Sequence, residues 1–223
     1  PKKVIVSGAG GQTGQALFRK LLAYPEEFQP LGLVRNEASK QKLVDTGVPP
    51  TNIYIADVTH PESIQAAVAF LTGGNHHPDG NDNDDGNGLY AFCICTSAKP
   101  APTDQVHPET GRPIFHFPNG NPELVDWMGQ KNQIDACPPG TLVVLCSTMG
   151  GTNPDHPLNN LGKTVNPDGT VSGGMIVQWK RKAEVYLMEQ SPKLKYTIVH
   201  PGGLLNEPGG ERELLVGVDD KVD

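Results

Sequence analysis

One stretch near the start of the chain constrains the fold more than any other. Residues 2–6 form a short run rich in β-branched residues, which is typical of a buried strand. The run leads into a loop with glycine at every third position, Gly8, Gly11 and Gly14, and then into a helical pattern. Glycine lets the backbone turn tightly and approach a ligand closely, and a helix N-terminus offers free N–H groups to an anion. The stretch therefore predicts a loop that binds the phosphates of a nucleotide.

The glycine spacing leaves an alternative open. It reads G-x-x-G-x-x-G, whereas the dinucleotide fingerprint of dehydrogenases is G-x-G-x-x-G. In the alternative, the glycines serve only to pack the helix against the strand. We favour phosphate binding because strand, glycines and helix follow one another in the required order. The predicted cofactor contacts in this loop are Gly8, Gly10, Gly11, Gln12, Thr13 and Gly14.

An alternation of strand and helix patterns organises the rest of the chain. Further strands are predicted at residues 28–34, 53–56, 89–95, 142–146 and 196–199. Helices are predicted at 12–22, at 36–46, from the turn 57–61 up to 71, at 122–136 and at 174–190. This order predicts an α/β protein with a Rossmann-like, doubly wound parallel sheet in the strand order 3-2-1-4-5-6. We expect one NAD(P)-binding domain over residues 1–223.

The charge of the chain limits its partners. Its 223 residues carry a formal net charge of −7 and no cluster of Lys and Arg, which argues against nucleic acid. No run approaches the roughly 20 apolar residues of a membrane span, so we expect a soluble protein. The chain starts without Met, directly in a strand, and shows no signal-peptide pattern. A removed targeting segment stays open, and we expect the cytoplasm or the plastid.

The cysteines and histidines lack the spacing of a metal site, and we predict no metal. Cys93, Cys95, Cys137 and Cys146 lie in or beside apolar segments. Cys93 and Cys95 share one face of a predicted strand, which favours core packing over redox chemistry. We therefore expect reduced thiols.

Two long segments interrupt the alternation. Residues 72–88 are polar and of low complexity, which predicts a flexible surface insertion. Part of it resembles the start of a calcium loop, but Phe92 stands where that loop needs a glutamate. Residues 97–121 are rich in proline and too long for a simple connection, so we predict a lid or a loop on the substrate side.

Arg35 indicates the kind of dinucleotide. It follows the strand 28–34, about 20 residues after the glycine loop, where an acidic residue would hold the ribose of NAD. Arginine at this place accommodates the extra phosphate of NADP, because its guanidinium forks onto phosphate oxygens. No Asp or Glu occurs at positions 33–36, so we predict NADP(H); the alternative is a solvated surface arginine. Asp57 and Val58 are placed to meet the adenine, although Asp57 could equally cap a helix.

Six motifs spread over nearly the whole chain resemble one known family. They are similar to those of the atypical short-chain dehydrogenase/reductases, an NAD(P)-binding, NmrA-like group, and within it to the plant proteins related to sanguinarine reductase. The motifs are GAGGQTG at 8–14, LGLVR at 31–35, VDWMGQKNQIDA at 125–136, MGGTNPDHPLN at 149–159, WKRKAE at 179–184 and RELLVG at 212–217. The resemblance implies a Rossmann fold with NADP(H) across the strand ends, and a family domain that continues beyond residue 223.

The resemblance also implies which residues surround the nicotinamide. Thr96, Ser97 and Ala98 would line the path of its ribose and ring. Reductases of this superfamily combine a Ser, a Tyr and a Lys: the Tyr donates a proton, and the Lys holds the ribose. Here Lys180 falls at the Lys position, but Ile176 stands at the Tyr position and cannot transfer a proton.

Other side chains would then handle the substrate and the proton. Thr148 falls at the hydroxyl position after the fifth strand, and Ser147 beside it offers a second hydroxyl. His156, in the following loop, is the candidate proton donor because histidine titrates near neutral pH, and Asp155 would orient it or replace it. The alternative is that residues 153–157 form a structural turn, since they are rich in turn-forming residues.

Three functions follow from these predictions. The first is an NADPH-dependent oxidoreductase that passes hydride to an unidentified small organic substrate. The second is a non-catalytic NADP(H)-binding regulatory or assembly protein, which Ile176 favours. A third, a purely structural Rossmann subunit of a larger complex, is compatible with the acidic charge but would not need Arg35. The expected partner is a small molecule, with a protein partner or a homo-oligomer as alternatives.

Overall fold

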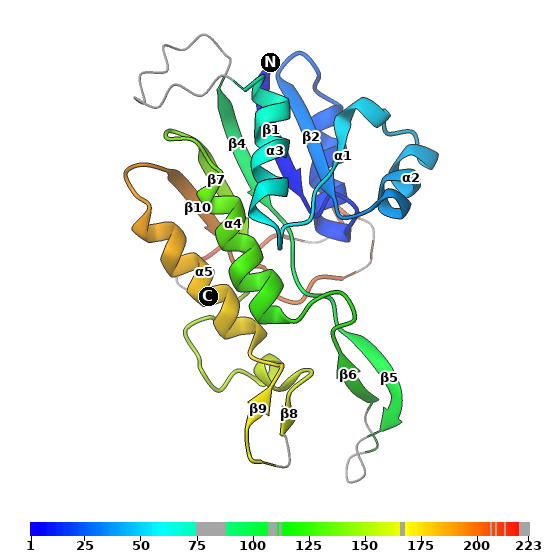
Figure 1. The fold of residues 1–223 in the computed structure, drawn as a ribbon, viewed down its shortest axis with the longest axis vertical. Helices are drawn as coiled ribbons and strands as arrows, with labels where there is room; N and C mark the ends of the chain where they lie inside the picture. The colour runs from blue at the N-terminus through cyan, green and yellow to red at the C-terminus, as the bar shows by residue number, and fades with distance from the viewer. Residues whose placement is uncertain are drawn as a thin grey trace.

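A computed structural model describes residues 1–74, 88–106, 111, 113–165, 168–205, 207, 209–211 and 213–218. Its centre is a sheet of six parallel strands in the order β10-β7-β4-β1-β2-β3 (Figure 1). This is the predicted order 3-2-1-4-5-6, and the Rossmann-like fold is confirmed. The strands are β1 (Lys2–Ser7), β2 (Phe28–Val34), β3 (Ile53–Ile55), β4 (Leu89–Ile94), β7 (Leu142–Cys146) and β10 (Lys195–Val199).

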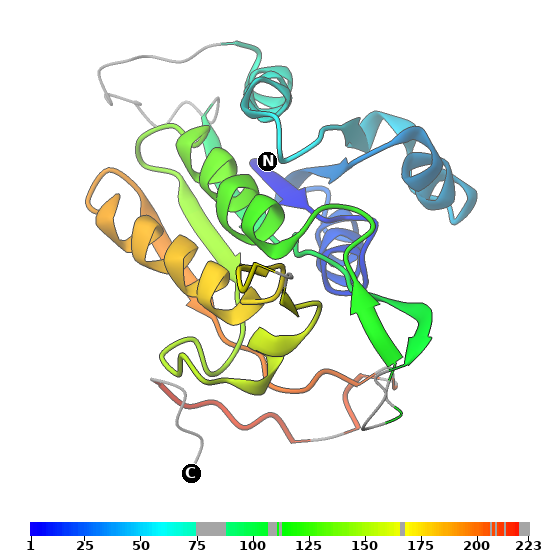
Figure 2. The ribbon, with the colours of Figure 1, turned by 60° about the horizontal axis from the view of Figure 1, so that its bottom comes forward.

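Helices cover both faces of this sheet (Figures 1 and 2). One face carries α3 (Pro61–Thr72), α4 (Gln130–Asp135) and α5 (Ile176–Glu189), and the other carries α1 (Gln12–Leu22) and α2 (Glu37–Asp45). The chain winds outward in both directions from β1, and open α/β sheets bind ligands at the carboxyl ends of the strands at such a point. None of the helices in the described part of the chain is both long and apolar enough to cross a membrane.

The apolar runs in the sequence explain the central strands. Ile5 and Phe92 are fully buried against α3, α4 and α5, whereas Val4 and Val6 are buried on the opposite face with Phe18 of α1. A strand that is buried on both faces reads as a continuous apolar run rather than an alternating one. The predicted bounds of α1, β2 and β7 agree with those of the structure.

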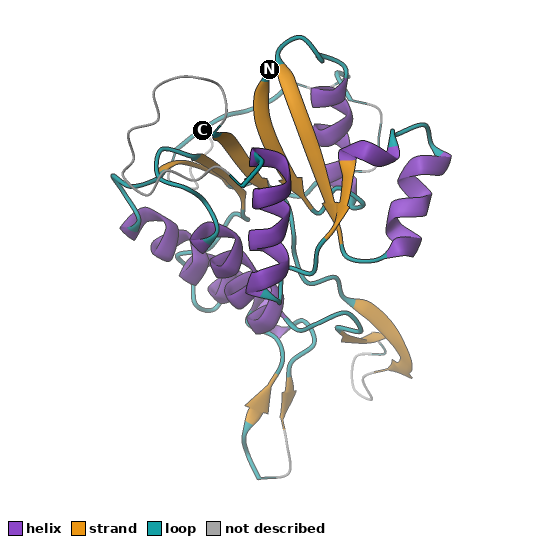
Figure 3. Ribbon diagram, turned by 45° about the horizontal axis from the view of Figure 1, so that its top comes forward, coloured by secondary structure: helices purple, strands orange, loops and turns teal. Residues whose placement is uncertain are grey.

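The proline-rich segment 97–121, predicted as a lid or a loop, contains an antiparallel hairpin of β5 (Ala101–Val106) and β6 (Pro113–His116). A second, shorter hairpin of β8 (Thr164–Val165) and β9 (Val171–Ser172) precedes α5. Figure 3 shows that both hairpins project away from the main sheet. Most of the predicted insertion 72–88, including its calcium-like stretch, lies outside the described residues.

The predicted helix 122–136 has a π-helical first half. Residues Glu123–Gly129 form the π-helix, and α4 continues from it. The wider π turns are uncommon and occur frequently at functional sites. Here the π-helix contributes the fully buried carboxylate of Asp126, whose partners are described below.

Candidate functional site

A cleft of about 670 Å³ lies at the carboxyl ends of the central strands. This volume falls within the range of small-molecule and cofactor sites. Arg35 and Lys99 are the cations among its lining residues, so an anion there meets positive charge although the whole chain is acidic. Eight of the predicted cofactor contacts line it: Gly8, Gly10, Gly11, Arg35, Asp57, Val58, Thr96 and Ser97.

The glycine loop is packed so tightly that two of its glycines admit no side chain. A Cβ atom at Gly14 would lie 2.2 Å from the Gly8 carbonyl oxygen, and one at Gly8 would lie 2.7 Å from the Cys95 carbonyl oxygen. Gly8 also has a φ of +66°, which side chains disfavour. Gly14 thus brings the first turn of α1 against the loop, and the exposed Gln12 and Thr13 lie in the same turn.

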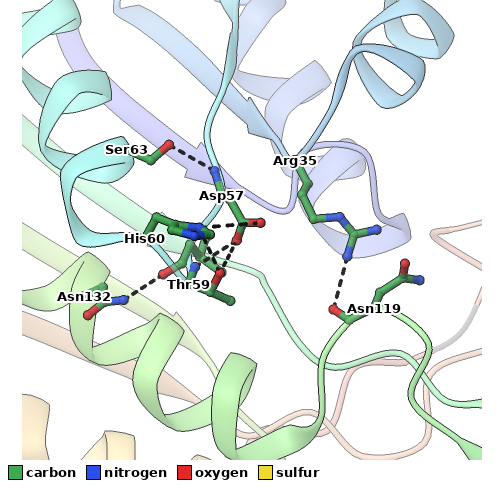
Figure 4. Close-up of polar contacts among 8 residues, drawn as sticks. Arg35, Asp57, Thr59, His60, Ser63, Asn119 and Asn132 are labelled. Atoms are coloured by element: carbon green, nitrogen blue, oxygen red, sulfur yellow. Dashed lines mark hydrogen bonds and ion pairs between the residues drawn. The ribbon is translucent and has the colours of Figure 1, made fainter.

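Arg35 lies exposed at the end of β2, on the wall of the cleft. Its Nη1 donates a hydrogen bond to the Asn119 carbonyl oxygen at 3.2 Å, across the cleft (Figure 4). Asn36 caps α2 by accepting from the Ser39 N–H at 3.0 Å, and Ser39 also lines the cleft. A guanidinium, a hydroxyl and a helix N-terminus thus lie at one end of the cleft, and this combination suits a phosphate.

Asp57 lies at the end of β3 in a closed polar turn (Figure 4). Its Oδ1 accepts from the N–H of Thr59 at 2.9 Å and from the Thr59 hydroxyl at 2.7 Å. Burial alone would raise the pKa of Asp57, but these hydrogen bonds and the charges of His60 and Arg35 lower it below the ordinary 3.8. Asn132 of α4 donates to the Val58 carbonyl oxygen at 2.9 Å and holds this turn against the helix.

The lowered pKa of Asp57 has a consequence for acid stability. The ionised carboxylate stabilises the fold above the ordinary pKa, and this contribution is lost as the pH falls through the lower pKa of the folded state. We expect Asp57→Asn to be less stable than the wild type at neutral pH and to lose less stability between about pH 5 and about pH 3. Urea unfolding at both pH values measures this, and an unchanged pH slope would show that Asp57 does not contribute.

Lys180 of α5 is engaged in a buried ion pair. Its Nζ lies 2.9 Å from Oδ1 of Asp126, and the two side chains are 9% and 0% exposed. The other carboxylate oxygen of Asp126 accepts from the Ala98 N–H at 3.0 Å. The pair therefore joins α5, the π-helix and the segment after β4. Lys180 and Ala98, both predicted cofactor contacts, are buried beside the cleft and are not among its lining residues.

A second buried carboxylate, Glu184, organises the end of β7. It is fully buried and accepts hydrogen bonds from the Ser147 hydroxyl and from Arg181 Nη1, the latter at 2.8 Å. His200 Nε2 lies 3.1 Å from the same Oε1 that Ser147 contacts. The sequence singled out Ser147, whereas the role of Glu184 as its partner was missed because 37 residues separate them.

The loop after β7 holds the remaining predicted catalytic residues. Thr148 is partly buried, Asp155 is exposed, and His156 accepts from the Leu158 N–H at 3.4 Å. Asn159, which sequence reasoning passed over, accepts from the N–H groups of Val177 and Gln178 at 3.0 and 3.4 Å. This loop thus supplies the side-chain cap for the N-terminus of α5.

Asn159 should matter for stability because it satisfies two helix N–H groups at once. We expect Asn159→Ala to lower the free energy of unfolding by about 1–2 kcal/mol, the usual cost of losing a helix cap. Asn159→Asp keeps the acceptor oxygen and should retain most of the stability. Urea unfolding compares the variants, and equal losses in both would refute the capping role.

The four cysteines form no disulfide; Cys93 and Cys137 are buried, and Cys95 and Cys146 are partly buried. Burial raises the pKa of Cys93 to about 11 and that of Cys95, which lines the cleft, to about 12. The thiolate is the nucleophile, so both side chains are poor nucleophiles at neutral pH. In the described part of the chain, no group of three or more His, Cys, Asp or Glu side chains is placed to hold a metal.

The chain is similar to plant proteins over nearly its whole length. It is 40% identical over 226 residues to an uncharacterised chloroplastic protein of Arabidopsis thaliana, covering 100% of this chain and 59% of that relative. It is 38% identical over 238 residues to sanguinarine reductase of Eschscholzia californica, covering 97% of this chain and 75% of that protein. The chain thus spans less than two thirds of the Arabidopsis relative. No family model matches the chain.

Solved structures share the fold. A short-chain dehydrogenase of Burkholderia cenocepacia in complex with NADP superimposes with a TM-score of 0.54 at 16% identity, covering 90% of this chain and 74% of that one. The anaerobillin reductase ChuY of Escherichia coli gives a TM-score of 0.54 at 18% identity, covering 92% and 74%. At these identities the likeness shows the fold alone.

Proposed function

We propose that this chain is an NADPH-dependent reductase of a small organic substrate. It belongs to the short-chain dehydrogenase/reductase family, and within it to the plant proteins similar to sanguinarine reductase. One observation carries the proposal: the glycine loop and Arg35 line the same cleft at the strand ends. No acidic residue at positions 33–36 competes for a ribose.

The residues of the cleft fit the parts of NADP(H). Gly8, Gly10 and Gly11 of the loop line the cleft, and N–H groups in the first turn of α1 would hold the pyrophosphate there. Arg35 and Ser39 would hold the 2′-phosphate. Thr96 and Ser97 would border the ribose and the nicotinamide. The bound cofactor supplies hydride, and the protein orients it.

The hydroxyls after β7 would orient the acceptor group of the substrate. The Ser147 hydroxyl donates its hydrogen bond to Glu184, so toward the substrate it can only accept, and Thr148 is the hydroxyl that would donate. Lys180 would act on the ribose only by leaving Asp126 or through its charge. For the proton we propose His156 with Asp155, since Ile176 offers none. His156→Gln should then lower turnover while leaving NADPH affinity unchanged.

The proposal is tested by mixing the protein with NADPH and a panel of quinones, aldehydes and cationic aromatic compounds. We expect NADPH to bind and its absorbance to fall with at least one acceptor, faster than with NADH at equal concentration. An acceptor that is reduced equally well with NADH would contradict the NADPH preference. NADPH binding without consumption by any acceptor class would refute the reductase.

That last outcome would favour a second function, a non-catalytic NADP(H)-binding regulator. Two observations support it specifically: Ile176 occupies the position of the proton-donating tyrosine, and Lys180 is already paired with Asp126. A regulator of this kind should change its affinity for a protein partner when NADPH is added. Gel filtration of the natural host's extract with and without NADPH would detect such a change.

For the compartment we propose the plastid. Two Arabidopsis relatives, 40% and 29% identical, carry the description chloroplastic. Fluorescent tagging of the protein expressed from its complete gene tests this, and a purely cytoplasmic signal would contradict it.

A further inference from the structure

The turn 117–121 reaches across the cleft to the residue that we assign to the 2′-phosphate. Asn119 and Gly120 line the same cleft as the glycine loop, although Asn119 is 84 residues from Arg35 in sequence. The contact uses the Asn119 backbone carbonyl, 3.2 Å from Arg35 Nη1, so it does not depend on the Asn119 side chain. Figure 4 shows the Arg35 guanidinium pointing toward the Asn119 backbone carbonyl.

The turn is anchored at both of its ends. On one side it continues from β6, which pairs with β5. On the other side the Asn121 side chain accepts from the Leu124 N–H at 2.8 Å, and the Asn121 carbonyl accepts from the Val125 N–H at 3.0 Å. Gly120 between them has a φ of +106°, and a Cβ there would lie 2.9 Å from Val125 Cγ2. The turn is therefore attached to the π-helix at Asn121, and the Asn119 carbonyl is the group that it presents to Arg35.

The chemistry of arginine allows one guanidinium to hold both the turn and a phosphate. A guanidinium carries five N–H donors in a fixed plane, and the Asn119 carbonyl takes one of them. The remaining donors are free to fork onto phosphate oxygens, which are stronger acceptors than a neutral carbonyl. A phosphate bound in this way would fix the otherwise exposed Arg35 in place, together with the contact to the turn.

We propose that the turn 117–121 is a strap that Arg35 closes over the adenosine end of the cleft, and that a 2′-phosphate tightens it. The strap thus makes the backbone at Asn119 part of the discrimination between phosphorylated and unphosphorylated dinucleotides. The inference rests on the proposed NADP(H) binding, and it adds that the 2′-phosphate is sensed by a segment that follows β6 as well as by Arg35.

Hydrogen exchange with nucleotide fragments tests the strap without requiring catalysis. The probes are 2′,5′-ADP and 5′-ADP, which differ in the 2′-phosphate, and calorimetry first measures the binding of each. We expect 2′,5′-ADP at saturation to slow exchange in the peptide that contains residues 117–121 several-fold more than 5′-ADP does. Equal protection by both, or faster exchange with 2′,5′-ADP, would overturn the strap while leaving NADP(H) binding intact. No binding of 2′,5′-ADP would overturn both.

Two pairs of variants separate the strap from the phosphate contact. In Gly120→Ala the added Cβ should displace the turn. Residues 117–121 should then lose the extra protection, the greater slowing of exchange by 2′,5′-ADP than by 5′-ADP, while Arg35 still binds 2′,5′-ADP. Gly47→Ala, also at positive φ but with no atom within 4 Å of its Cβ, should keep it. Arg35→Gln should abolish the extra protection, and Lys20→Gln, which removes an equal charge from α1, should not. Extra protection that survives in either Gly120→Ala or Arg35→Gln would refute the strap.

Discussion

Arg35→Gln is expected to weaken NADPH binding by roughly 10- to 100-fold, because hydrogen bonds to charged groups contribute about 1.5–3 kcal/mol each. NADH has no 2′-phosphate, so its affinity should change by no more than about 2-fold. Arg35 is exposed, and surface substitutions usually change stability by about 0.5 kcal/mol or less, so a folding defect does not account for this difference. Calorimetric titration of both dinucleotides measures the two changes.

Lys20→Gln serves as the matched control for this prediction. It removes the same charge from an exposed position on α1 and should leave both affinities unchanged. If Arg35→Gln weakened NADPH and NADH equally, Arg35 would act on the shared part of the cofactor or on the fold. The assignment of Arg35 to the 2′-phosphate would then be wrong.

Lys180→Met is expected to have the largest effect on stability. It leaves the fully buried Asp126 carboxylate without its cation, and breaking a buried pair in this way costs about 3–5 kcal/mol. The double variant Lys180→Met/Asp126→Asn removes both charges and should recover part of this loss. Urea unfolding of the single and double variants gives the coupling energy of the pair.

Lys182→Met is the control on the same helix. Lys182 is exposed and lies over the rings of Trp127 and Trp179, with its Nζ 4.5 and 5.3 Å from their centroids. An exposed cation–π contact contributes about 0.5–1 kcal/mol, so this variant should be only slightly destabilised. Similar losses in Lys182→Met and Lys180→Met would contradict the special cost of the buried pair.

The sheet was predictable because its signals are local. Residues 30–34 of β2 form a run without polar side chains and are buried, and Asn36 caps the following helix as its side chain suggests. Strands alternating with helices then allow few topologies, because parallel crossovers are right-handed. The structure departs from the prediction where prolines occur: Pro102 and Pro113 read as loop residues, yet both lie in the hairpin of β5 and β6.

The site was predictable only in part, because its key contacts join distant segments. The glycine loop and Arg35 belong to a local pattern with known spacing, and the structure brings them into one cleft. The partners of the buried groups depend on how α5 and the π-helix lie against the sheet, which no local pattern encodes. Glu184 appeared in the sequence only as the last residue of the motif at 179–184, and Asn119 carried no signal at all. The remaining catalytic assignments, Thr148 and His156 among them, stay predictions.

Titration of the unmodified protein with NADPH and with NADH tests most directly whether the cleft is an NADPH site. Enhanced nicotinamide fluorescence on binding reports both affinities under the same conditions. We predict that NADPH binds at least about 10-fold more tightly than NADH, because one charge-assisted contact to the 2′-phosphate already contributes that ratio. Equal affinities, or no binding of either dinucleotide, would contradict the account.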